Sequence, residues 1–278
     1  MYRSILVHLD DTPRAPLRLD VAVRLAVAHD AQLVGVYLVP GTDFTPFTAA
    51  MIPSDIVQRR LEAAESAQEA AEAMFRDAAA HAGMEEPDWR APAGDSRQAA
   101  VVHARYADLA VLGQPPRNEP DYAFANELSN AVVMGSGRPV LFVPASGVGN
   151  ALGARIMIGW KDTRESARAV ADSVPFLRKA DQVSAVTVSA KSEEGLFDRV
   201  AEKQLEAFLA RHGVSTTVKH VAAANGHEGE ALLAEAADAN ADLLVIGGYS
   251  RPRIAELMWG GVTRTILHSM SVPVLMSH

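Results

Sequence analysis

The chain has 278 residues, a formal net charge of −8 and no cysteine, which excludes disulfides, thiolate zinc sites and a cysteine nucleophile and favours a reducing compartment. No run of Lys or Arg is dense enough to neutralise phosphates, so we expect neither nucleic acid nor an anionic membrane surface as a partner. The apolar run at the N-terminus is shorter than that of a signal peptide, and no stretch approaches the roughly 18 apolar residues of a membrane span. We therefore expect a cytoplasmic protein.

In chain order, the first half contains four short runs rich in Val, Ile and Leu, at residues 5–9, 35–38, 108–113 and 139–143. Their polarity does not alternate, which is typical of strands buried on both faces of a parallel sheet. Between the second and the third run, Pro53-Ser54 predicts the start of a long helix, and Gly83 predicts its end. Strands alternating with helices indicate an α/β fold with right-handed crossovers.

The second half repeats these runs at residues 156–160, 185–188, 242–247 and 273–277, and Gly213 repeats the helix end. The third and fourth runs recur with the same spacing as in the first half, whereas the first runs lie 151 residues apart and the later ones 134. The sequence thus predicts two copies of one doubly wound parallel-sheet domain. We place them at residues 1–144 and 154–278, joined by a small, polar, Gly-rich linker at 145–153, and expect the extra length of the first copy around Gly41–Pro53 and the following helix.

Five segments of the chain carry a further signal, namely residues 5–10, 138–141, 242–250, 259–264 and 272–275. In this order and in duplicate, they resemble the universal stress protein family. The resemblance implies a Rossmann-like, adenine-nucleotide-hydrolase-like fold, two halves related by a pseudo-twofold axis, and a role in the response to stress. It also implies a ligand class, ATP or a related adenine nucleotide, with magnesium present only as the nucleotide's own ion.

Nucleotide-binding members of that family carry a glycine, two residues, a second glycine, nine residues, and a glycine followed by Ser or Thr. Glycine lets backbone N–H groups approach phosphates, and the next helix offers its N-terminal donors. In the second half Gly247 matches, Ser250 replaces the second glycine, and Gly260 follows nine residues later. The predicted ligand residues of this half also include three neighbours of that loop: Arg251, Gly261 and Thr263.

The family's acid at the end of the first strand is present as Asp10 in the first half, but Lys161 takes its place in the second. The first half loses the phosphate loop instead, because Gln114-Pro115-Pro116 follows Gly113 and Glu127 lies where the later loop would bind phosphate. We therefore include Asp10 among the ligand residues and expect the second half to bind phosphate better. Two alternatives stay open: Asp10 and Asp11 cap the following helix, and Gly260-Gly261 permits close packing at a helix start.

The chemistry of an enzyme is not indicated. The nine histidines are scattered without metal-ligand spacing, no Gly-x4-Gly-Lys loop occurs, and Gly135-Ser136-Gly137 precedes a strand where a nucleophile elbow would follow one. We expect a non-catalytic nucleotide-binding protein, with ATP hydrolysis at most slow and incidental.

Two other functions remain open from the sequence. One is a nucleotide-free scaffold, in which the closing strands at 139–143 and 273–277 pair the two halves and then associate two chains. The other is a receiver-like phosphoacceptor built on Asp10-Asp11. That fold needs an Asp at the end of its third strand, but Asp55 lies at a predicted helix start.

Overall fold

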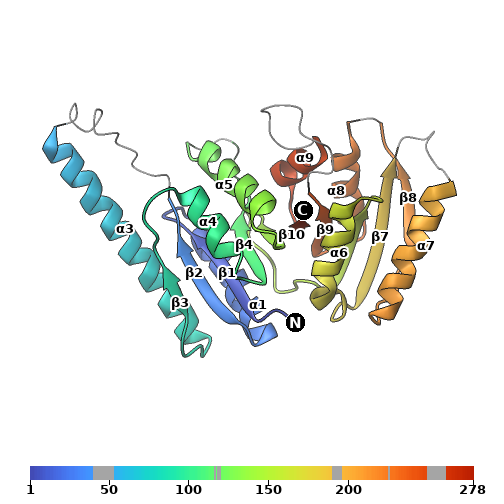
Figure 1. Ribbon diagram of the computed structural model, residues 1–278, viewed down its shortest axis with the longest axis horizontal. Helices are drawn as coiled ribbons and strands as arrows, with labels where there is room; N and C mark the ends of the chain where they lie inside the picture. The colour runs from blue at the N-terminus through green and yellow to red at the C-terminus, as the bar shows by residue number, and fades with distance from the viewer. Residues whose placement is uncertain (40–52, 116, 118–119, 190–195, 225, 249–260) are drawn as a thin grey trace.

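The computed structural model describes residues 1–39, 53–115, 117, 120–189, 196–224, 226–248 and 261–278 (Figure 1). The first half comprises β1 (Ser4–Leu9), α1 (Ala15–His29), β2 (Gln32–Tyr37), α3 (Ser54–His81), β3 (Asp88–Arg90), α4 (Ser96–Ala104), β4 (Leu109–Gly113), α5 (Tyr122–Gly135) and β5 (Val140–Val143). The second half comprises β6 (Arg155–Trp160), α6 (Arg164–Leu177), β7 (Gln182–Ser189), α7 (Leu196–Arg211), β8 (Val218–Ala222), α8 (Glu228–Asp238), β9 (Leu243–Gly247), α9 (Gly261–Ser269) and β10 (Val274–Ser277).

The strands form one sheet in the order β3-β2-β1-β4-β5-β10-β9-β6-β7-β8. Neighbouring strands are parallel except β5 and β10, which pair antiparallel with Leu141 opposite Leu275 near the middle of the molecule (Figure 1). This confirms the predicted α/β fold with two parallel-sheet units, and the predicted pairing of the halves through their closing strands. Each closing strand also pairs with a strand of its own half, so both of its edges are occupied within the chain.

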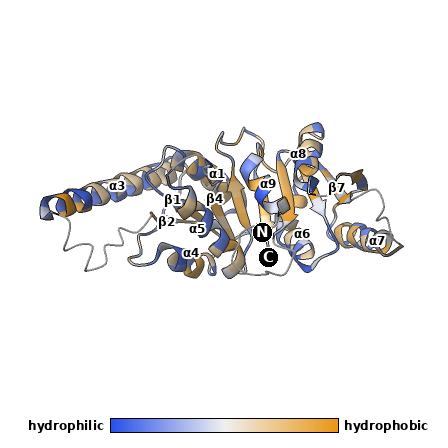
Figure 2. Ribbon diagram, turned by 90° about the horizontal axis from the view of Figure 1, so that it is seen from above, coloured by the Kyte–Doolittle hydropathy of each residue, from blue (hydrophilic) through white to orange (hydrophobic). Residues whose placement is uncertain are grey.

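The helices cover the sheet in two layers, with one apolar cluster on each face. One cluster joins side chains of α1, α3, α6 and α7, and the other joins side chains of α4, α5, α8 and α9. Figure 2 shows the strongly apolar strands between these helices. Burial of the strands on both faces explains why their sequences are continuous apolar runs.

The extra length of the first half lies largely in α3, which has 28 residues against 16 in its counterpart α7. Both helices end as the sequence predicts, since Gly83 and Gly213 take φ values of +73° and +78° that glycine adopts without steric penalty. Despite the length of α3, no helix in the described part of the chain is both long and apolar enough to cross a membrane.

An aspartate at the start of the fourth strand performs the same structural task in each half. Asp108 accepts hydrogen bonds from the backbone N–H groups of Arg3 and Ser4 at 2.7 and 3.2 Å. Asp242 accepts them from Gly153, Ala154 and Arg155 at 2.9–3.1 Å. These bonds satisfy the N–H groups at the start of the first strand of each half, so the repeated Asp in the sequence is structural.

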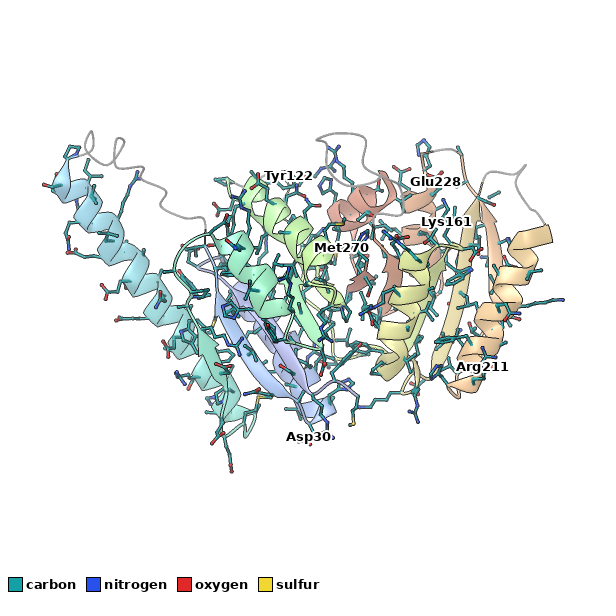
Figure 3. All side chains as sticks on the ribbon, in the orientation of Figure 1. Asp30, Tyr122, Lys161, Arg211, Glu228 and Met270 are labelled. Carbon is teal, nitrogen blue, oxygen red and sulfur yellow. The ribbon has the colours of Figure 1, made fainter. Side chains whose placement is uncertain are left out.

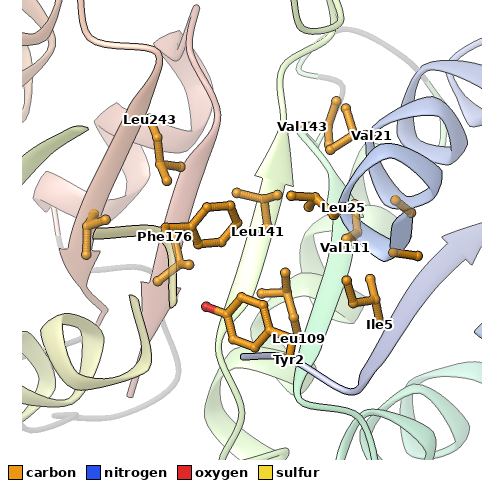
Figure 4. Close-up of a cluster of buried hydrophobic side chains, with 14 of the residues drawn as sticks. Tyr2, Ile5, Val21, Leu25, Leu109, Val111, Leu141, Val143, Phe176 and Leu243 are labelled. Carbon is orange, nitrogen blue, oxygen red and sulfur yellow. The ribbon is translucent and has the colours of Figure 1, made fainter. Parts of the chain in front are cut away.

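Side chains also join the halves beside the β5–β10 pair. The Tyr2 hydroxyl donates to the Asp172 carbonyl oxygen at 2.7 Å, and the Tyr2 ring lies 5.6 Å from the Phe176 ring (Figure 4). On another side of the interface, the Tyr122 hydroxyl lies 2.8 Å from Nε2 of His268. The two halves thus share a continuous core across the closing strands.

Candidate functional site

The first candidate site is a hollow at the carboxyl ends of β1 and β4. The chain leaves these adjacent strands toward opposite sides, and such a switch point is where open α/β sheets bind ligands. The residues that line it include Asp10, Thr12, Arg18, Gly113 and Phe124. The cavity volume is about 40 Å³. This is room for a few water molecules, whereas ligand pockets usually measure roughly 300 Å³ or more.

The side chain of Arg18 lies in this crevice. Its Nη2 lies 2.6 Å from Oδ1 of Asp10, and the two side chains are only 6% and 13% exposed. Its Nε donates to the carbonyl oxygen of His8 at 3.1 Å. A Cβ atom at Gly113 would lie 2.8 Å from Nη1 of Arg18. Gly113 therefore makes space for the guanidinium of the protein itself.

Asp10 is held by this ion pair and by a local turn. Its Oδ1 accepts hydrogen bonds from the Thr12 backbone N–H at 3.1 Å and from the Thr12 hydroxyl at 2.6 Å. Burial alone would raise the pKa of Asp10, but the Arg18 guanidinium and the Thr12 hydroxyl outweigh burial and lower it. The alternative role of Asp10 as a cap for α1 is wrong, because its carboxylate bonds to Thr12 and Arg18 and the N-cap residue is Arg14.

His8 anchors the floor of the crevice. It is 5% exposed, and its Nε2 lies 2.8 Å from the carbonyl oxygen of Leu38. Burial lowers the pKa of His8 to about 4, so the imidazole is neutral at physiological pH. A neutral ring facing a carbonyl oxygen carries its proton on that nitrogen and donates it.

The loop after β4 contributes to the interface between the halves. The side-chain Nε2 of Gln114 donates to the carbonyl oxygens of Leu267 and His268 at 2.9 and 3.2 Å, and its Oε1 accepts from the Ala145 N–H at 2.9 Å. Glu127, at the position of the family's later loop, lies inside α5 and pairs with Arg97 at 2.8 Å. In the first half, Gln114 thus joins the two halves, and Glu127 forms an exposed ion pair within its own half.

The corresponding positions of the second half carry different residues. At the repeat offset of 151, Ala169 corresponds to Arg18, and Lys161 to Asp10; Lys161 is exposed at the end of β6 (Figure 3). A Cβ atom at Gly247 would lie 2.5 Å from the backbone nitrogen of Ser166 in the first turn of α6. Gly247 therefore lets the helix backbone itself approach the end of β9.

The other predicted ligand residues of this half lie in the first turn of α9 or precede that helix in the sequence. Gly261 is the first residue of α9 and is exposed. Thr263 is 4% exposed and packs inside the fold. Ser250, Arg251 and Gly260 lie outside the described residues. Among the residues that the structure describes, no group of three His, Asp or Glu side chains could hold a metal ion.

Arg18 is the functional residue that sequence reasoning missed. A signal was available, since Arg18 lies on the helix face that carries Ala15, Leu19, Ala22 and Leu25, all of them buried. A charged residue on a buried face requires a partner. Asp10, at the end of the preceding strand, is the acid that the sequence offers nearest to it.

Comparisons with known proteins agree with this architecture. The model of the "Universal stress protein family" matches residues 1–144 and 155–278. The chain is similar in fold to a universal stress protein from Archaeoglobus fulgidus DSM 4304, with a TM-score of 0.72 and 15% identity over 98% of this chain and 95% of that one.

It is also similar to a putative universal stress protein from Pseudomonas aeruginosa UCBPP-PA14, with a TM-score of 0.59 and 15% identity over 99% and 93% of the two chains. No curated protein matches the chain. With both halves matched, the chain belongs to the universal stress protein family as a tandem member with two Usp domains.

Proposed function

We propose that this protein is a non-catalytic stress-response protein that binds ATP or a related adenine nucleotide through its second half. The observation that supports the proposal is the difference between equivalent positions of the two halves. In the first half Arg18 lies in the crevice and pairs with Asp10 at 2.6 Å, whereas the second half has Ala169 at the matching position. A nucleotide entering the first half would have to break a buried ion pair, which costs about 3–5 kcal/mol.

The second half supports binding through the start of α9. Gly261 is exposed at the start of α9, where the positive end of the helix dipole favours phosphate. Ser250, Arg251 and Gly260 precede it in the segment that matches the family's phosphate loop, and Gly247 and Thr263 flank that segment. Lys161 in place of the acid implies that the base or ribose is recognised differently from other members of the family.

Isothermal titration of the full chain with ATP and ADP in the presence of magnesium tests this proposal. We expect one nucleotide per chain, and weaker binding after Arg251→Glu, which places a negative charge in the proposed phosphate loop. Arg178→Glu is the matched control, because Arg178 is exposed at the opposite end of α6. Absence of heat at high micromolar nucleotide would sink the proposal, as would a second equivalent site.

A nucleotide-free scaffold is the second candidate function. It is favoured by Gly247, whose close approach to the backbone of Ser166 accounts for a glycine at this position without a ligand. Extraction of small molecules from the purified protein distinguishes the two functions. A co-purifying adenine nucleotide supports nucleotide binding. The absence of any nucleotide, together with a titration that gives no heat, supports the scaffold.

A further inference from the structure

Helix α3 extends beyond the body of the first half. At 28 residues it is about 42 Å long, but its buried residues, Ala71, Phe75 and Ala79, all lie in its second half. There Phe75 packs against Trp89, with ring centroids 5.5 Å apart. None of residues 54–70 is buried, and this part of the helix stands away from the sheet in both views (Figures 1 and 2). We call residues 54–70 the arm.

The arm continues the apolar stripe with which α3 packs onto its own domain. Val57, Leu61, Ala64 and Gln68 lead into Ala71 and Phe75 with alternating spacings of four and three residues. This is the seam of a coiled coil, in which a second helix fills the stripe. On the arm the middle of that seam is open: Leu61 keeps 51% of its surface exposed and Ala64 is exposed, whereas Val57 and Gln68 are partly covered.

The charges of the arm are divided along its length. Residues 54–61, at the tip, carry Arg59, Arg60 and Asp55, a net charge of +1. Residues 62–70, toward the body, carry three glutamates and no basic residue, a net charge of −3. Two arms side by side in the same direction would place the three glutamates of each against the other. Two arms in opposite directions place the basic tip of each beside the acidic base of the other.

We propose that the arm pairs antiparallel with the arm of a second copy of this chain, about a twofold axis near the middle of residues 54–70. The positions of the two domain bodies also favour antiparallel arms. Beyond residue 70 the stripe is covered by the protein's own domain, so parallel arms would force the two bodies into the same space. In the antiparallel pair Leu61 lies against the partner's Ala64, and Val57 against the partner's Gln68. Small Ala side chains let the helices approach to roughly 8 Å.

Sedimentation equilibrium of the full chain, from about 1 to 200 μM, tests the pairing. We expect a monomer–dimer equilibrium in which Ala64→Glu weakens the dimer at least about tenfold, because it buries a charge in the seam against the partner's Leu61. Ala63→Glu is the matched control, since Ala63 is exposed on the outward side of the same arm and the substitution is identical. A monomer throughout the concentration range, or a dimer equally affected by both variants, overturns the proposal.

Disulfide trapping tests the direction of the arms. The chain has no cysteine, so introduced thiols are the sole reactive ones. Under mild oxidation we expect the double variant Val57→Cys/Gln68→Cys to form a covalent dimer, and Val57→Cys alone to remain uncrosslinked. The two Val57 positions are about 16 Å apart axially in the antiparallel pair, beyond disulfide reach. Crosslinking by Val57→Cys alone would show parallel arms and overturn the proposal.

Discussion

The two halves share strand order and helix placement, yet they fill the space beside the fourth strand by different means. In the first half, a Cβ atom added to Gly113 would lie 2.8 Å from the guanidinium of Arg18. In the second half, a Cβ atom added to Gly247 would lie 2.5 Å from the backbone nitrogen of Ser166. Both glycines match the family's sequence pattern. A retained glycine therefore marks a close approach, and its neighbour decides whether a ligand or the protein itself makes that approach.

The largest expected effect comes from breaking the ion pair that lies in the first crevice. Arg18→Met leaves the Asp10 carboxylate buried without its partner, and we expect a loss of about 3 kcal/mol or more in the free energy of unfolding. Urea denaturation measures it. Adding Asp10→Asn should restore part of the loss, because the uncompensated charge is then gone.

Arg76→Met is the matched control for this variant. Arg76 forms an exposed ion pair with Glu72 on α3, and its removal should change stability by less than about 1 kcal/mol. Equal losses from Arg18→Met and Arg76→Met would mean that the first crevice does not depend on its buried pair.

The second effect is a pH dependence of the free energy of unfolding that arises from His8 in the first half. Burial lowers the pKa of His8 to about 4, against an ordinary 6.5, whereas the repeat places Gly159 at this position. As the pH falls, the unfolded chain binds this proton first, so stability present above about pH 6.5 is lost progressively down to about pH 4. The loss is on the order of 3 kcal/mol for His8.

Urea titrations at a series of pH values between 7 and 4 test this dependence. His29 changes in the same direction, since burial lowers its pKa to about 4 as well. His8→Gln keeps a hydrogen-bond donor for the Leu38 carbonyl oxygen. It should reduce the slope of the free energy of unfolding against pH by the contribution of His8. The exposed control His81→Gln should leave the slope unchanged, and an unaltered slope in His8→Gln would contradict the assignment.

The third effect compares the two glycines directly. Gly247→Ala drives a methyl group against the backbone of α6, which cannot move without its helix, and we expect a loss of about 2 kcal/mol. Gly113→Ala meets only the end of the Arg18 side chain, which can shift, so its loss should be smaller. Thermal unfolding of the pair measures the difference. A larger loss from Gly113→Ala would reverse the roles given to the two neighbours.

The sequence was sufficient for the fold because its signals are local and repeated. Uninterrupted apolar runs marked the buried strands, and Gly83 and Gly213 marked two helix ends by their backbone conformation alone. The edge strand β3 escaped notice, since its three residues are only partly buried and carry no apolar run. The burial of Arg18 and its pairing with Asp10 were predictable from the helix face and the nearby acid. Its approach to Gly113 was not, because that contact joins residues far apart in the sequence.

The smallest effect concerns the interface that makes one sheet of the two halves. Tyr122→Phe removes the hydroxyl that lies 2.8 Å from Nε2 of His268, and we expect a loss of about 1 kcal/mol. Tyr106→Phe is the matched control, because Tyr106 is 80% exposed. If calorimetry shows one transition that shifts only in Tyr122→Phe, the bond couples the halves. If both variants unfold at the same temperature as the parent, the β5–β10 pair and the shared apolar core hold the two halves together without help from this bond.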